Sequence, residues 1–157
     1  MEKNDTLLQA FEWYLPDDSQ HWNKLKVLAP SFSNLGVTLV WLPPAYKGAG
    51  GVHDVGYGVY DLYDLGEFDQ KGTIPTKYGT KQEYLDAIGA LQKENISVLA
   101  DIVLNQKMGG DTEETIDVIK TDPNNRNEEI SGDYQITAWT KFTFPNRKGK
   151  YSTFIWN

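Results

Sequence analysis

Three polar side chains near the middle of the chain could take part in chemistry: Asp101, Asn105 and Gln106, in the run DIVLNQ. The run continues an apolar segment that begins at Ser97, and the alternation of a strand would place Asp101 and Asn105 on one face and only apolar side chains on the other. An ionised carboxylate buried there is costly unless a cation or hydrogen-bond donors meet it. The run therefore predicts the floor of a binding site or, equally well, a structural carboxylate bonded to neighbouring groups.

The segments before this run indicate how it is positioned. Residues 7–13 predict a first strand, and the side chains of residues 17–19 could cap a helix that stops at Gly36. Residues 37–42 are rich in β-branched side chains and end at two prolines, which predicts a buried strand.

A second helix is predicted from Thr80, because Thr80 and Glu83 have the spacing of a capping box, and it should run to about Glu94. The strand containing DIVLNQ follows. The order β-α-β-α-β is typical of parallel strands joined by right-handed crossovers, so we expect an α/β fold.

The connection between the second strand and the second helix, residues 43–79, is much longer than such loops usually are. It leaves the C-terminal end of a parallel strand, where ligands bind in α/β proteins. It contains no phosphate-binding glycine motif, which disfavours a nucleotide, whereas its aromatic rings, acids and amides suit a neutral polyhydroxy ligand. The alternative is that Tyr57, Tyr60 and Tyr63 only pack the loop.

No further strand–helix alternation follows Gln106. We expect a short helix around residues 113–120, an Asx-rich turn at 122–127 and strands within 134–144 and 150–156, forming a small antiparallel module. The turn lacks the glycine and distal glutamate of an EF-hand loop, so it does not predict a calcium site.

Composition excludes several classes of function. With 15 basic and 22 acidic residues the net charge is −7, which disfavours nucleic acid as a partner. No apolar stretch is long enough to cross a membrane, and the first residues do not resemble an export signal. The absence of cysteine excludes disulfides and thiolate metal sites and is compatible with a cytoplasmic location.

Five segments together resemble the N-terminal portion of bacterial liquefying and intracellular alpha-amylases, from about Leu7 to the last residue. They are QAFEWYLP (9–16), VWLPPAYKG (40–48), DVGYGVYDLYDLGEFDQKGTIPTKYGTK (54–81), DIVLNQKMGGD (101–111) and AWTKFTFPNRKGKYSTFIW (138–156). The resemblance implies the first three strands of a (β/α)8 barrel, residues 1–104, and most of a β-rich domain B inserted after strand three, residues 105–157.

The resemblance also implies that the catalytic groups lie elsewhere. A (β/α)8 domain typically has about 250 residues, and in the family the nucleophilic Asp, the acid/base Glu and a third carboxylate lie on strands four, five and seven, beyond Asn157. The remaining part of the barrel is therefore an expected partner, and the chain alone is expected to be inactive.

Four residues match family positions, and a fifth is expected to bind substrate beside one of them. Tyr57 matches a ring that stacks on the sugar beside the cleaved bond, and Trp13 is expected to bind substrate with it. Asp101 matches a supporting acid, and Asn105 matches a residue that contributes one oxygen ligand to calcium, leaving the site incomplete in this chain. Gln106 stands where the family has His; its amide can still donate a hydrogen bond to the sugar but cannot become cationic.

The expected function is hydrolysis of internal α-1,4-glucosidic bonds of starch, glycogen or maltodextrins, with retention, by the complete enzyme. The alternative is a truncated or degenerate, non-catalytic chain that at most binds α-glucans.

Overall fold

The computed structural model describes residues 4–151. Its elements, in chain order, are β1 (Leu7–Gln9), α1 (His21–Asn34), β2 (Leu39–Leu42), β3 (Lys47–Gly48), a 3-10 turn (Gly51–His53), β4 (Val59–Asp61), α2 (Lys81–Lys93), β5 (Ser97–Ala100), β6 (Thr112–Val118), β7 (Tyr134–Lys141) and a second 3-10 turn (Pro145–Arg147).

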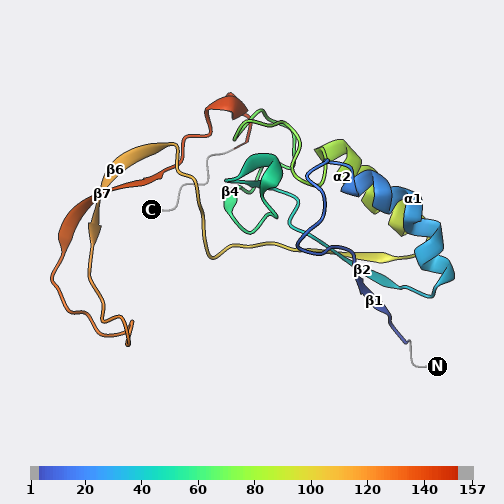
Figure 1. Cartoon of the computed structure of the whole chain (residues 1–157), viewed down its shortest axis with the longest axis horizontal. Coiled ribbons are helices and arrows are strands. Elements are labelled where there is room, and N and C mark those ends of the chain that lie inside the picture. Colours follow the sequence, from blue (N-terminus) through green and yellow to red (C-terminus); the bar gives the residue numbers. More distant parts are fainter. Residues whose placement is uncertain (1–3, 152–157) are drawn as a thin grey trace.

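Strands β1, β2 and β5 form a three-stranded parallel sheet in that order, which confirms the predicted α/β arrangement. Helices α1 and α2 lie side by side over one face of it, and the β6–β7 hairpin projects at the other end of the molecule (Figure 1). The register aligns Leu8, Val40 and Val98 across the three strands.

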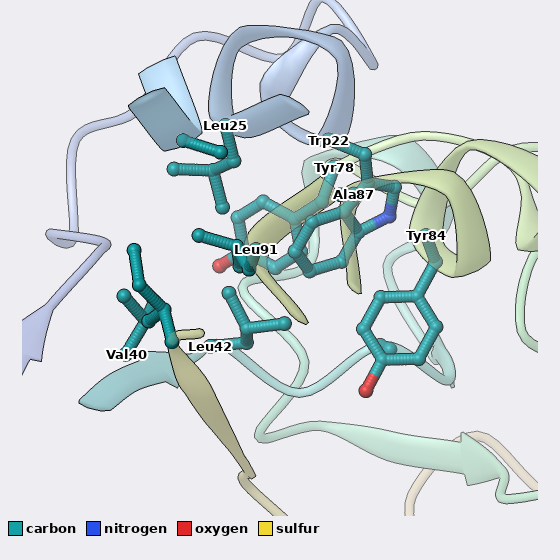
Figure 2. Packing of buried hydrophobic residues seen from close by; sticks show 11 residues of the cluster. Trp22, Leu25, Val40, Leu42, Tyr78, Tyr84, Ala87 and Leu91 are labelled. Carbon is teal, nitrogen blue, oxygen red and sulfur yellow. The ribbon is translucent and has the colours of Figure 1, made fainter. Parts of the chain in front are cut away.

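The core lies between this aligned row and the two helices. Val40 and Leu42 of β2 are fully buried against side chains of both helices, among them Trp22, Leu25 and Leu91 (Figure 2). Burying each large apolar side chain stabilises the fold by about 1.5–3 kcal/mol. Both helices thus cover the same face of the sheet. Within residues 4–151 no helix covers the opposite face.

The helix ends divide the sequence predictions. Thr80 and Glu83 form the capping box as predicted, and Glu94 is the C-cap residue of α2. Gly36 follows α1 with a φ of +79°, a conformation that favours glycine. The predicted N-cap at residues 17–19 is wrong: the cap residue is Gln20, whose backbone N–H is bonded by the Asp18 carboxylate.

Two further predictions are corrected. The third strand ends at Ala100, so DIVLNQ follows the strand instead of continuing it. Residues 113–120 form most of strand β6 and not a helix, because the β-branched side chains of Thr112–Val118 pair with those of Tyr134–Lys141. The Asx turn is confirmed, since Asp122 accepts from the backbone of Asn124 and Asn125. Most of the strand predicted at 150–156 lies outside the described residues.

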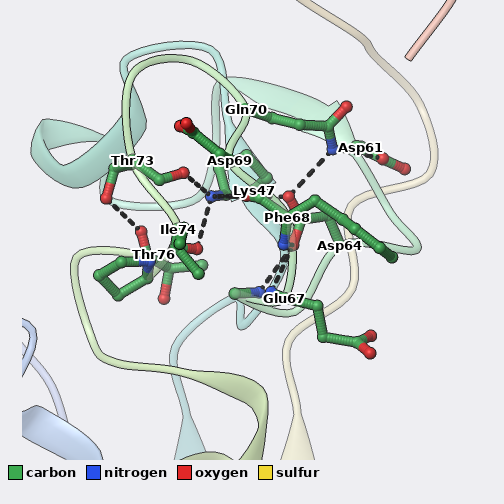
Figure 3. A network of polar contacts seen from close by, with 12 residues as sticks. Lys47, Asp61, Asp64, Glu67, Phe68, Asp69, Gln70, Thr73, Ile74 and Thr76 are labelled. Carbon is green, nitrogen blue, oxygen red and sulfur yellow. Dashed lines mark hydrogen bonds and ion pairs between the residues drawn. The ribbon is translucent and has the colours of Figure 1, made fainter. Parts of the chain in front are cut away.

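The long connection, residues 43–79, is folded around buried charge (Figure 3). The Lys47 ammonium donates to the carbonyl oxygens of Phe68, Thr73 and Ile74 and lies 3.5 Å from the Asp64 carboxylate, with both side chains fully buried. Burial lowers the pKa of Lys47. Because three carbonyl oxygens and one carboxylate surround the ammonium, its hydrogen bonds stabilise the irregular backbone of this loop.

The β6–β7 hairpin is attached to this loop at its base. Asp111 accepts hydrogen bonds from the Tyr60 hydroxyl (2.7 Å) and from the backbone of Thr143 and Phe144. Arg147, buried beyond the hairpin, lies 3.1 Å from the Asp61 carboxylate of β4. Across residues 4–151, neither helix has the length and apolar character needed to cross a bilayer.

Candidate functional site

A cleft of about 470 Å³ opens at the C-terminal ends of β1 and β2. Its lining comes from the segment after β1, from strand β2 and from the long loop: Gln9, Phe11, Glu12, Trp13, Trp41, Val55, Tyr57 and Tyr78. Gln9 and Trp41 are paired neighbours that alternate with the core residues Leu8 and Val40, so they point to the face that the helices do not cover. The cleft therefore lies at the strand ends where α/β proteins bind ligands.

Aromatic rings dominate this cleft. The rings of Trp13 and Tyr57 are stacked, with centroids 6.2 Å apart and an interplanar angle of 6°. Trp13 is 61% exposed, so one face of a flat platform remains open to solvent. Phe11 and Trp41 pack edge to face beside them. Such rings can stack on the C–H faces of a sugar while nearby polar groups bond its hydroxyls.

Asp101 meets its hydrogen-bond donor at this cleft. The Tyr57 hydroxyl donates to the Asp101 carboxylate over 2.8 Å. Burial, together with this hydrogen bond, raises the pKa of Tyr57 to about 12, so the hydroxyl keeps its proton and remains the donor. The carboxylate that needed a partner in the sequence thus obtains it from the long loop, and it fixes the outer end of the Tyr57 ring.

The backbone around Tyr57 is shaped by Asp54, a residue that no sequence pattern singled out. Asp54 accepts from the backbone N–H groups of Gly56 and Gly58 (2.8 and 3.2 Å). Gly56 has a φ of +98°, and a Cβ at Gly58 would lie 2.5 Å from an Asp54 carboxylate oxygen. Because both flanking positions require glycine for these reasons, the GYG sequence itself was the available signal.

Gln106 also contacts Tyr57, with its side chain bonded to the main chain of Tyr57. The Gln106 side-chain amide donates to the Tyr57 carbonyl oxygen over 2.7 Å. Two residues further along each segment, the Met108 backbone N–H donates to the Val59 carbonyl oxygen, also over 2.7 Å. The structure therefore brings together Trp13, Tyr57, Asp101 and Gln106, four of the five residues singled out in the sequence.

Asn105 does not line the aromatic cleft. It lines a second cleft, of about 420 Å³, between the segment after β5 and the hairpin, where Glu114 is the one carboxylate of the lining. Within residues 4–151 no cluster of three or more His, Asp or Glu side chains could hold a metal ion. Calcium takes six to eight oxygen ligands, of which the Asn105 side chain could supply one.

Two other tyrosines of the loop, Tyr60 and Tyr63, pack against aromatic or polar neighbours. Tyr60 is 2% exposed and donates to Asp111, and Tyr63 stacks against Tyr151. The packing interpretation therefore fits Tyr60, whereas Tyr63 is 39% exposed and lines an apolar cleft, and Tyr57 lines the aromatic cleft. As a chemical unit, the site offers an aromatic platform and polar groups that are held in place, which suits binding of a neutral polyhydroxy ligand.

Relatives of the chain have been characterised. It is 56% identical over 153 residues to an alpha-amylase of Geobacillus stearothermophilus, covering 98% of this chain and 28% of that protein. It is 52% identical to an alpha-amylase of Bacillus licheniformis over 98% of this chain and 30% of the relative. It is 50% identical to the cytoplasmic alpha-amylase of Escherichia coli over 99% of this chain and 31% of the relative. No family model matches the chain.

Solved structures are similar as well. An alternansucrase in complex with isomaltotriose superposes with a TM-score of 0.76 at 26% identity, over 88% of this chain and 13% of that one. A truncated alternansucrase from Leuconostoc mesenteroides gives the same values. The chain thus spans less than a third of the length of the curated relatives reported above.

Proposed function

Since the chain belongs to the alpha-amylase family of glycoside hydrolases, we propose that it is the N-terminal portion of an enzyme that hydrolyses internal α-1,4-glucosidic bonds of starch, glycogen or maltodextrins. The observation that carries the proposal is the stacked Trp13–Tyr57 pair in a cleft at the strand ends. Stacked rings beside hydrogen-bonding groups suit a chain of glucose units.

The sheet supports the view that this is part of a larger barrel. We propose that residues 1–104 supply the first three strand units of a (β/α)8 domain and residues 105–157 most of an inserted domain B. Leu7 and Leu99 are 54% and 43% exposed on the face that the helices do not cover. Beyond β5, Ile102 and Leu104 line an apolar cleft of about 380 Å³. Exposed apolar surface at an open sheet edge calls for a covering partner, here the remaining part of the barrel.

The roles of the chain's own residues follow from their contacts. Trp13 and Tyr57 would stack on the glucose units, and Asp101 would hold the Tyr57 hydroxyl. Retaining hydrolysis needs two carboxyl groups about 5 to 5.5 Å apart, one as nucleophile and one as acid and then base. Neither role is assigned to a residue of this chain, because the family carries those groups on later strands.

Two further features are proposed, a calcium ligand from the family resemblance and a cytoplasmic location from one relative. Asn105 would supply one oxygen ligand to calcium, and the other ligands would come from outside the described residues. A cytoplasmic location is proposed because one relative is the cytoplasmic alpha-amylase of Escherichia coli, and fractionation of source cells would test it.

A chimaera tests the proposed function. The matching segment of the Bacillus licheniformis alpha-amylase would be replaced by this chain, to which it is 52% identical. The expected result is release of reducing ends from starch, with a marked loss when Tyr57→Ala is introduced. The exposed Gln92→Ala on α2 serves as the matched control and should keep full activity. A folded chimaera that releases no sugar would contradict the proposal.

The second candidate, a non-catalytic chain that binds α-glucans, is favoured by a cleft whose aromatic platform is complete within this chain. Calorimetry of the 157-residue chain with maltoheptaose, with and without calcium chloride, separates the two. Heat of binding without hydrolysis, independent of calcium, is expected if the platform works alone. A folded chain that gives no heat excludes this candidate.

A further inference from the structure

We propose that Gln106 is a positioning residue, which fixes the sugar-stacking ring of Tyr57 by holding its backbone carbonyl. The amide of Gln106 donates to the Tyr57 carbonyl oxygen over 2.7 Å. This role rests on the proposed function of Tyr57 as the glucan platform. It differs from a direct contact between Gln106 and the sugar, because here the amide acts on the ligand only through Tyr57.

Three contacts fix Tyr57 from different sides. Asp101 accepts from its hydroxyl, and Asp54 bonds the N–H groups of the residues before and after it, Gly56 and Gly58. None of these contacts involves the backbone carbonyl oxygen of Tyr57, and the Gln106 amide donates to that oxygen. Because Tyr57 is flanked by two glycines, its backbone has unusual freedom, and each contact removes part of that freedom before a ligand arrives.

The geometry of the neighbouring segment supports this role. The Met108 N–H donates to the Val59 carbonyl oxygen, so residues 106 and 108 run beside residues 57 and 59 with the same two-residue spacing. At the first of these two positions the side chain of Gln106 takes the place of a backbone donor. An amide is neutral and always carries its N–H groups, so the contact does not depend on pH.

Gln106 also connects two parts of the molecule. Its side chain lines the cleft that contains Asn105 and Glu114, between the strand end and the hairpin, while its amide reaches back to the aromatic cleft. Any displacement of the segment after β5 is therefore transmitted to the Tyr57 backbone. The stacked geometry with Trp13 is the feature that such a displacement would disturb.

The test is NMR spectroscopy of the full chain with Gln106→Met, which keeps the length but removes the donor, and Gln106→Glu, which keeps the shape but offers only acceptors at pH 7. The Gly58 amide nitrogen belongs to the same peptide group as the Tyr57 carbonyl and reports its hydrogen bond directly. Both variants should shift the Gly58 amide and the Trp13 indole signals. Gln92→Met, an exposed change on α2, should shift neither.

Titration with maltoheptaose provides the second measurement. Affinity should fall roughly two- to tenfold in Gln106→Met, the net value of one hydrogen bond. Unmoved Gly58 and Trp13 signals in both variants would overturn the proposal. If those signals move but the parent chain does not bind maltoheptaose, the positioning role stands and glucan binding by the isolated chain is excluded. If the signals move and the affinity is unchanged, Gln106 does not act on the ligand through Tyr57 and the proposal fails.

Discussion

Two long segments follow the C-terminal ends of parallel strands, and they are built in opposite ways. The loop after β2, residues 43–79, folds around the fully buried Lys47 and Asp64. The chain after β5, residues 101–151, contains the β6–β7 hairpin, most of whose side chains are exposed. Both are polar in sequence, yet the first buries charged side chains at its centre, whereas in the second the buried Arg147 lies beyond the hairpin, against Asp61 of the loop.

The difference teaches how irregular and regular backbones are held. The loop has few strand hydrogen bonds of its own, so side chains satisfy its backbone: Asp64 accepts from the N–H groups of Gly66, Glu67 and Phe68. The strands of the hairpin satisfy their backbone by pairing, and side chains bond the backbone at its base and in the Asx turn between the strands. We call residues 4–100, which hold the sheet, both helices and the long loop, the body. The buried charge network should therefore control the stability of the body, whereas the contacts at the base should control only the stability of the hairpin.

The largest effect is expected at the centre of the loop. Asp64→Ala would leave the buried Lys47 ammonium without its carboxylate, which costs about 3–5 kcal/mol of the free energy of unfolding. Asp117→Ala, on the exposed hairpin, should cost less than about 0.5 kcal/mol. Urea unfolding of the two variants checks the contrast, and equal losses would show that the network contributes nothing special.

An intermediate effect is expected at the base of the hairpin. Asp111→Ala removes the acceptor for Tyr60, Thr143 and Phe144, at a cost of about 1–3 kcal/mol. Amide hydrogen exchange in β6 and β7 should then become roughly 5- to 150-fold faster while that of α1 and α2 stays unchanged. Faster exchange throughout the chain would mean that hairpin and body unfold as one unit.

A smaller effect is expected from pH and should be confined to the body. His21 is buried beside Trp22 and Tyr78, and burial lowers its pKa below the ordinary value of 6.5. The unfolded chain therefore binds a proton that the folded chain excludes, so stability falls as the pH drops through 6.5 towards the folded pKa and is fully present above it.

Urea unfolding at pH 7.5 and 5.5, in a His53→Gln background, measures this effect because His21 is then the remaining imidazole of the two in the chain. The additional change His21→Gln should abolish the dependence. Since neither imidazole lies in the hairpin, the protection of the β6 and β7 amides, after correction for the intrinsic pH dependence of exchange, should not respond. A response there would break the contrast between the two segments.

Much of the fold was predictable, because local rules decide it. Alternating strands and helices gave the parallel order, and the capping box at Thr80 placed the start of α2. The failures occurred where tertiary contacts override local preference. The sequence predicts a helix at residues 113–120, but pairing with β7 makes the stretch up to Val118 part of the strand β6.

The sequence by itself determined which chemistry the site can offer: an acid after the third strand, an aromatic ring between two glycines, and an amide at Gln106. Only the tertiary structure decided how they are used. It joined Asp101 to the Tyr57 hydroxyl 44 positions away, and Gln106 to the Tyr57 carbonyl 49 positions away. The physical reason is that hydrogen bonds act over about 3 Å, and only the folded chain brings such distant residues that close.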